Sequence, residues 1–95
     1  MNQKIKKKWV DALRSGNYLQ GMGWLAYEGQ YSCLGVLCDV MCTFACYYEG
    51  FIDALPHFVM KRAGLNKDVE HMLYYANDVA GYSFSEIADW IEENL

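Results

Sequence analysis

The chain has 95 residues, of which 54% are hydrophobic and 16% aromatic. This length fits one domain over residues 1–95, and the hydrophobic content excludes a disordered chain. The net charge of −4 argues against general nucleic-acid binding, because neutralising a phosphate backbone requires a basic surface.

The first element predicted along the chain is a helix over residues 3–15. Ile5, Trp9, Ala12 and Leu13 recur at helical spacing and give this helix one apolar face. Its other face is basic, and the simpler interpretation of that face is solvation rather than contact with phosphate. The dipeptide Ser-Gly that follows Arg14 ends the helix, since glycine suits a left-handed cap.

A segment rich in glycine and aromatic residues follows, and it predicts a small β-hairpin over about 22–32. The strands would be 22–27 and 30–32, joined by a turn at Glu28-Gly29. A two-stranded hairpin is marginal alone, so it has to pack on the helices.

The letters GMGWLA, starting at Gly21, match the pattern of a dinucleotide-binding loop. A genuine fingerprint follows a strand and opens a helix within a βαβ unit, whereas a helix precedes this one. We therefore reject a dinucleotide site and expect these glycines to let the backbone bend beside Trp24.

Residues 33–47 are nearly all apolar and predict a buried central helix, which the segment Tyr31 to Asp39 opens. A short strand over 33–38 is the alternative. Gly35, Asp39 and Thr43 lie four residues apart and form a narrow seam of small and polar residues along this helix.

Asp39 requires hydrogen-bond donors or a cation, because burying a lone carboxylate is costly. The expected partners are Arg14, Gln20, backbone amides or the basic residues within 61–67. We favour a structural role for Asp39, in an internal ion pair or a cap, over a role that faces a ligand.

Cys38, Cys42 and Cys46 lie on one stripe of the central helix. Three thiols on one helix climb about 6 Å per step and cannot close a tetrahedral metal site alone. Cys33, at the helix start, is the one reasonable nucleophile, but no catalytic signature surrounds it. We expect core packing for these thiols, and no metal, cofactor or catalytic residue.

Three more helices are predicted, over 56–63, over 69–77 and from Ser83 to the end. Ser83 and Glu86 form the pattern of a capping box. The Asn-Asp pair before the last helix predicts a turn that caps local backbone groups. The expected fold is α+β and predominantly helical, with four to five short helices around the central helix and one small hairpin.

Three stretches of sequence carry a family resemblance: WVDALRSGNYLQGMGWL, YSCLGVLCDV and ANDVAGYSFSEIADWIEENL. In this order they resemble a family of small phage and prophage proteins of unassigned function, and the middle run is the most specific. The resemblance implies an accessory protein in the cytoplasm of an infected bacterial host. Proteins of that size and setting often counter host defence by binding a defence protein or sequestering a nucleotide signal.

We therefore expect a non-enzymatic inhibitor of host defence that binds a nucleotide-like signal or a host defence protein. Arg14 would meet phosphate and Gln20 would read a polar edge of the ligand. The remaining candidate residues would stack on a base or read its edges: Tyr18, Trp24, Tyr27, Asp39 and Asn77.

Two alternatives come from other classes of protein. Residues 68–95 hold seven acidic residues and no Lys or Arg, which favours a module that docks on a basic partner or mimics nucleic acid. A small metal- or thiol-dependent protein is the second alternative. No apolar run reaches the length of a membrane span, and the high hydrophobic fraction favours a homo-oligomer.

Overall fold

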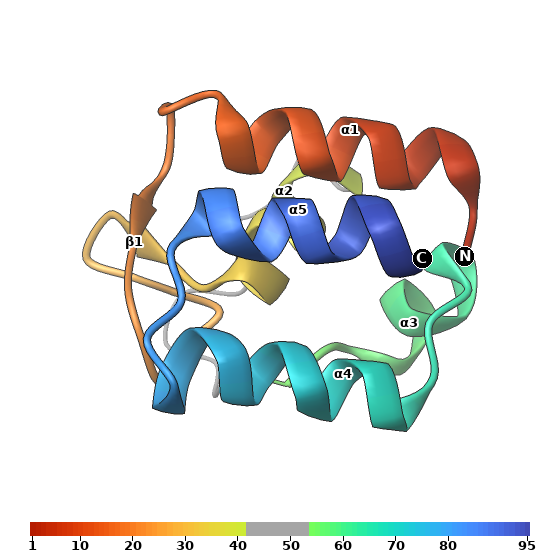
Figure 1. The fold of residues 1–95 in the computed structure, drawn as a ribbon. Helices are drawn as coiled ribbons and strands as arrows, with labels where there is room; N and C mark the ends of the chain where they lie inside the picture. The colour runs from red at the N-terminus through yellow and green to blue at the C-terminus, as the bar shows by residue number, and fades with distance from the viewer. Residues whose placement is uncertain (42–53) are drawn as a thin grey trace.

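The computed structural model describes residues 1–41 and 54–95, which form five α-helices, one π-helical turn and a three-stranded sheet (Figure 1). The predicted class, a predominantly helical α+β domain, is confirmed. The elements in chain order are α1 (Gln3–Arg14), β1 (Leu19–Gln20), β2 (Ala26–Tyr27), β3 (Gln30–Tyr31), α2 (Cys33–Met41), α3 (His57–Ala63), α4 (Lys67–Tyr74), the π-helical turn η2 (Tyr75–Val79) and α5 (Phe84–Asn94).

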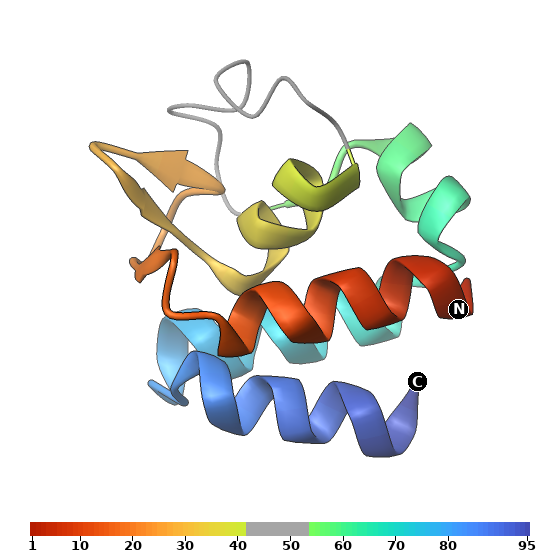
Figure 2. The ribbon, with the colours of Figure 1, turned by 90° about the horizontal axis from the view of Figure 1, so that it is seen from above.

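The long helices pack with their axes nearly aligned. In Figure 1, α5 lies between α1 and α4 and runs antiparallel to both. Figure 2 shows α5 on one side of α1 and α4, with α2, α3 and the hairpin on the other side. The two ends of the chain meet, since the Gln3 side-chain amide donates to the Leu95 carbonyl at 3.3 Å.

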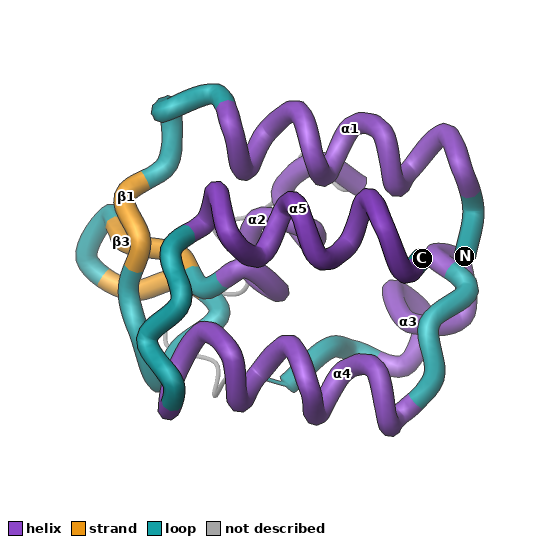
Figure 3. The backbone as a smooth tube through the Cα atoms, viewed as in Figure 1, coloured by secondary structure: helices purple, strands orange, loops and turns teal. Residues whose placement is uncertain are grey.

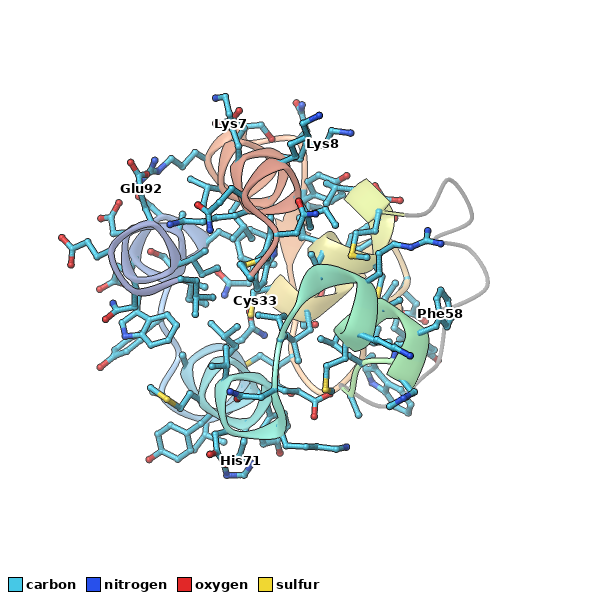
Figure 4. The ribbon with its side chains drawn as sticks, turned by 90° about the vertical axis from the view of Figure 1, so that its right-hand side faces the viewer. Lys7, Lys8, Cys33, Phe58, His71 and Glu92 are labelled. Carbon is cyan, nitrogen blue, oxygen red and sulfur yellow. The ribbon has the colours of Figure 1, made fainter. Side chains whose placement is uncertain are left out.

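One hydrophobic core cluster joins side chains from all five helices, and α1 supplies three of its buried residues. Trp9 and Leu13 of the predicted apolar face are buried, and so is Val10. The indole N–H of Trp9 donates to the carbonyl of Cys33 at 2.9 Å, which satisfies the one polar group of this side chain. Figure 4 shows Cys33 at the centre of the molecule, between the helices.

The central helix is present and every residue from Cys33 to Cys38 is buried, so the strand alternative is wrong. We expected the segment from Tyr31 to Asp39 to form the start of this helix. The helix begins at Cys33 instead, because Tyr31 belongs to β3. Ser32 caps the helix, since its hydroxyl accepts the Gly35 N–H at 3.0 Å. The rest of the predicted span, including Thr43, lies outside the described residues.

The hairpin is confirmed and packs backbone to backbone on the central helix. A Cβ atom on Gly35 would lie 1.7 Å from the carbonyl oxygen of Leu25. That carbonyl also accepts the backbone N–H of Ser32 at 3.2 Å. Gly35 is therefore the residue of the predicted seam that lets the hairpin approach the helix.

The sheet contains one strand that the sequence did not predict (Figure 3). β2 and β3 pair antiparallel, and the turn between them places Glu28 and Gly29 at φ 51° and 80°. β1 pairs in parallel with β3, with Leu19 opposite Gln30. The strands are shorter than predicted, because the Gly23 N–H bonds to the Asp78 carboxylate at 2.9 Å rather than to a neighbouring strand.

The second half of the chain follows the predicted helices with one correction. α4 begins at Lys67, two residues early, and continues directly into η2. Asn77 therefore lies in a π-helical turn and is fully buried, so the prediction of a turn capping only local backbone is wrong.

The predicted capping box at the start of α5 is confirmed. The Ser83 hydroxyl accepts the Glu86 N–H at 3.2 Å, and the Ser83 N–H donates to the Glu86 carboxylate at 3.0 Å. Ser83→Ala should lower the free energy of unfolding by about 1 kcal/mol, or about 5 °C in Tm. Ser85→Ala, at an exposed position of the same turn, is the matched control and should change little. Equal losses in urea unfolding would contradict the role of the cap.

Candidate functional site

Arg14, the predicted phosphate ligand, connects α1 to α5. Its guanidinium contacts the carboxylate of Asp89 at 2.7 Å and also that of Glu92. The hydrogen bond to Asp89, followed by that to Glu92, raises the pKa of Arg14 above its ordinary value. Figure 4 shows Glu92 beside α1, with Lys7 and Lys8 on the outer side of that helix. The charge of Arg14 is therefore already met by two carboxylates.

Tyr18 and Asp39, two further predicted ligand residues, bond to each other. The Tyr18 hydroxyl donates to the Asp39 carboxylate, and its ring packs edge-on against Tyr31 with centroids 5.1 Å apart. Among the described residues, the partner of Asp39 is thus Tyr18. The prediction that Arg14 or Gln20 meets Asp39 is wrong, since Arg14 bonds to Asp89 and Gln20 bonds to Asn77. The segment after α1 brings Tyr18 beside α2, 21 residues away from Asp39 in the sequence. The spacing of residues along the chain does not predict this contact.

Burial and the hydrogen bond to Asp39 raise the pKa of Tyr18. The unfolded tyrosine titrates near pH 10, so the unfolded state loses this proton first as the pH rises. The stability that Tyr18 contributes is complete below about pH 10 and falls above it. Urea unfolding across that range should show a steeper loss for the natural chain than for Tyr18→Phe. Parallel pH profiles would contradict this assignment.

Asn77 is the centre of a buried polar network. Its side-chain oxygen accepts the Cys33 N–H at 3.1 Å and the Gln20 amide at 2.8 Å. Its amide donates to the Gly21 carbonyl at 2.9 Å and to Asp78 at 2.7 Å. Every hydrogen-bonding position of this side chain is therefore used. The predicted ligand residues Gln20 and Asn77 join the loop after α1 to α2 and η2.

Trp24 and Tyr27 form an exposed aromatic pair on the hairpin. Their rings stack with centroids 5.3 Å apart, and each side chain is about two-fifths exposed. With Gly21 and Met22 they line a surface hollow of about 210 Å³, whose one charged lining residue is Glu28. The hollow offers an aromatic face, but a carboxylate at its rim does not attract phosphate.

A larger cavity, which the sequence did not reveal, lies between α4–η2 and α5. Its volume is about 420 Å³, within the range of about 300–1,000 Å³ typical of ligand sites. The residues that line it are His71, Met72, Leu73, Tyr75, Ala76, Ala80, Tyr82, Glu86, Ile87 and Trp90. We call it the α4–α5 cavity.

The mouth of the α4–α5 cavity is apolar and exposed. Met72, Tyr75 and Tyr82 are each half exposed or slightly more. Figure 4 shows His71 at the outer side of α4. The spacing of these residues along the sequence does not predict a cavity, because its walls need side chains from two antiparallel helices.

One carboxylate lines the α4–α5 cavity, and two more lie near one end of it. Glu86 lines it directly, and among the described residues the one hydrogen bond to its carboxylate is that from the Ser83 backbone. By helical spacing Glu93 shares a face of α5 with Trp90, and Asp68 shares a face of α4 with Met72. Because α4 and α5 are antiparallel, this spacing puts both carboxylates at the same end of the cavity.

The described cysteines belong to the core. Cys33 and Cys38 are fully buried, and the Cys33 thiol contacts the Leu73 carbonyl at 3.6 Å. Within residues 1–41 and 54–95 no group of three His, Cys, Asp or Glu side chains could hold a metal ion. Cys42 and Cys46 lie outside the described residues. None of the described helices is long and apolar enough to cross a membrane.

One family model, named Domain of unknown function (DUF8296), matches residues 1–95. The chain belongs to this family. No curated protein and no solved structure matches it significantly.

Proposed function

We propose that this chain is a non-enzymatic binding protein that captures a partner protein through the face of α4 and α5. The observation that carries the proposal is the α4–α5 cavity, whose lining is mostly apolar and whose mouth is exposed. An exposed apolar patch within a polar surface is typical of an interaction site. His71 and Glu86 are among the titratable residues that line the cavity. The Glu86 carboxylate already accepts the Ser83 N–H in the helix cap, so its position is explained without a catalytic role, and this supports binding rather than catalysis.

The charge of this face defines the kind of partner. Residues 68–95 carry seven acidic residues and no Lys or Arg, and a complementary surface on the partner would be basic. Four of the seven have partners within the protein: Arg14 pairs with Asp89 and Glu92, the buried Glu70 accepts the Leu55 N–H, and Asp78 accepts the Gly23 N–H. Asp68, Glu86 and Glu93 are exposed. The resemblance to phage proteins supports a defence protein of the bacterial host as the partner, with the complex forming in the host cytoplasm.

Capture from a lysate of a bacterial host tests this proposal when matched variants accompany it. The tagged natural chain should retain one host protein, and Met72→Gln with Tyr75→Gln should lose it, because both changes remove apolar surface at the cavity mouth. Phe58→Gln is the control, since Phe58 is also half exposed but lies on α3, away from the cavity (Figure 4). The retained protein should dissociate at high salt. Equal retention by all variants would contradict the proposal.

A nucleotide-like signal is the second candidate ligand, and the exposed stack of Trp24 on Tyr27 favours it. A pair of stacked aromatic rings can hold any of the bases, because every base has a flat π-face. Binding the phosphate of a nucleotide would also require a positively charged side chain nearby. A thermal-shift screen of cyclic and linear nucleotides decides this candidate. A nucleotide that raises Tm for the natural chain but not for Trp24→Ala would support it, and no rise with any nucleotide would exclude it.

A further inference from the structure

We infer that the α4–α5 cavity binds an organic cation, meaning a positively charged nitrogen carried on an apolar body. This inference rests on the proposed function, in which the chain captures a partner protein. The organic cation would then be a basic side chain of the partner that lies beside apolar residues. The carrying observation is the composition of the cavity lining, in which aromatic rings, aliphatic side chains and one carboxylate meet.

The aromatic part of the lining comes from three elements. Tyr75 belongs to η2, Tyr82 to the loop after it and Trp90 to α5. The faces of such rings carry negative partial charge and attract ammonium and guanidinium groups, and Trp and Tyr are the stronger partners. Several rings around one cavity are a common way for proteins to hold an alkylated ammonium group.

The charged part of the lining points to the same chemistry. Glu86 contributes a carboxylate with one oxygen on the Ser83 N–H and, among the described residues, no partner for the other oxygen. No Lys or Arg lines the cavity. The nearest basic residue along the chain is Lys67, whose ammonium lies 3.8 Å from the carboxylate of Glu70. A cation in the cavity therefore meets the Glu86 carboxylate and no Lys or Arg, although the imidazole of His71 also lines the cavity. The same carboxylate disfavours phosphate.

The size and aliphatic walls of the cavity define the rest of the ligand. A volume of about 420 Å³ exceeds what one ammonium group fills. Met72 provides exposed aliphatic surface beside the rings, and burying an apolar body against it adds hydrophobic stabilisation. Leu73 and Ile87 also line the cavity, but they already belong to the core. The cavity therefore fits a cation attached to an aromatic or aliphatic body better than a small inorganic cation.

A pair of matched probes tests the charge preference directly. The first is hydroxymethylbenzyl-trimethylammonium, and the second is its neutral isostere, in which a tert-butyl group replaces the trimethylammonium group. Titration followed by backbone NMR shifts should place both probes at the α4–α5 cavity, with the cation bound about tenfold more tightly. Equal affinity, tighter binding of the neutral probe, or shifts confined to the Trp24–Tyr27 hollow would overturn the inference.

Glu86→Gln is the decisive variant, because Gln also completes a capping box and the helix cap is retained. It should weaken binding of the cation about threefold or more and leave the neutral probe unchanged. Trp90→Leu should reduce the preference for the cation further. A preference unaffected by both changes would contradict the assignment of these side chains.

The outcomes separate this inference from the proposed function. If a host protein is captured through Met72 and Tyr75 while the two probes bind equally, the cation site is wrong and the binding function stands. If the cation is preferred while capture is equal in all variants, the cation site stands and the role in capturing a protein is wrong.

Discussion

Gly35→Ala is expected to lower the free energy of unfolding by about 3 kcal/mol or more, although alanine is the better helix former. The added Cβ would lie 1.7 Å from the Leu25 carbonyl oxygen and 2.7 Å from its carbon. Leu25 cannot move away freely, because its side chain is fully buried and its carbonyl accepts the Ser32 N–H. The hairpin would have to separate from α2, which exposes core surface. Urea unfolding measures the loss.

Gly16→Ala is the control for this prediction. Gly16 has a φ of 77°, and a Cβ added there would have no atom within 4 Å, so alanine meets backbone strain alone. The expected cost is about 1 kcal/mol. A similar cost at Gly35 and Gly16 would contradict the close contact between the hairpin and the central helix.

Asn77→Leu is expected to cost about 3 kcal/mol, even though leucine has a similar size. The change leaves the Cys33 N–H and the Gly21 carbonyl without the partners that Asn77 provides. A buried polar group that loses its partner costs about 1–3 kcal/mol, and this network has more than one such group. Chemical unfolding of the variant and the natural chain gives the difference.

Asn94→Ala is the matched control for the Asn77 variant. Asn94 is exposed, and its side-chain amide donates to the carbonyl of Trp90 at 2.8 Å. Its removal should change the free energy of unfolding by less than about 0.5 kcal/mol. If Asn77→Leu were equally mild, the loop after α1 would not depend on the buried network for its position.

Local patterns predicted the helices well, because periodicity and caps are written in neighbouring residues. The apolar face containing Trp9 predicted α1, and Ser83 with Glu86 predicted the start of α5. β1 escaped prediction because two residues cannot show an alternating pattern. The π-helical turn η2 does not follow from the periodicity that predicts a helix over 69–77, since Asn77 in this turn bonds to residues distant in the sequence.

The candidate site was harder to predict than the helices. The acidic character of residues 68–95 was evident, but the α4–α5 cavity depends on the antiparallel packing of two helices and on the aromatic side chains between them. Asp39 and Asn77 were both predicted to contact a ligand, and each bonds to other residues of the chain. Their partners are distant in the sequence, so composition and spacing could not identify Tyr18 or Cys33 as the groups that they contact.

Part of the uneven charge distribution has a structural explanation. Arg14 of the basic first helix pairs with Asp89 and Glu92 of α5, and Lys6 donates to the Glu92 carbonyl at 3.0 Å. Opposite charges at the two ends of the chain therefore favour the contact of α1 with α5. Glu86 lies instead at the α4–α5 cavity, where we propose that it helps to recognise a partner.

Hydrogen–deuterium exchange of the captured complex tests the central claim, that α4 and α5 form the binding face. Residues 71–90 should exchange more slowly when the partner is bound, because they contain the lining of the cavity. Residues 18–31, which contain the hairpin and its aromatic pair, should exchange at the same rate with and without the partner. Slower exchange in 18–31, with no change in 71–90, would contradict this claim and place the site on the hairpin.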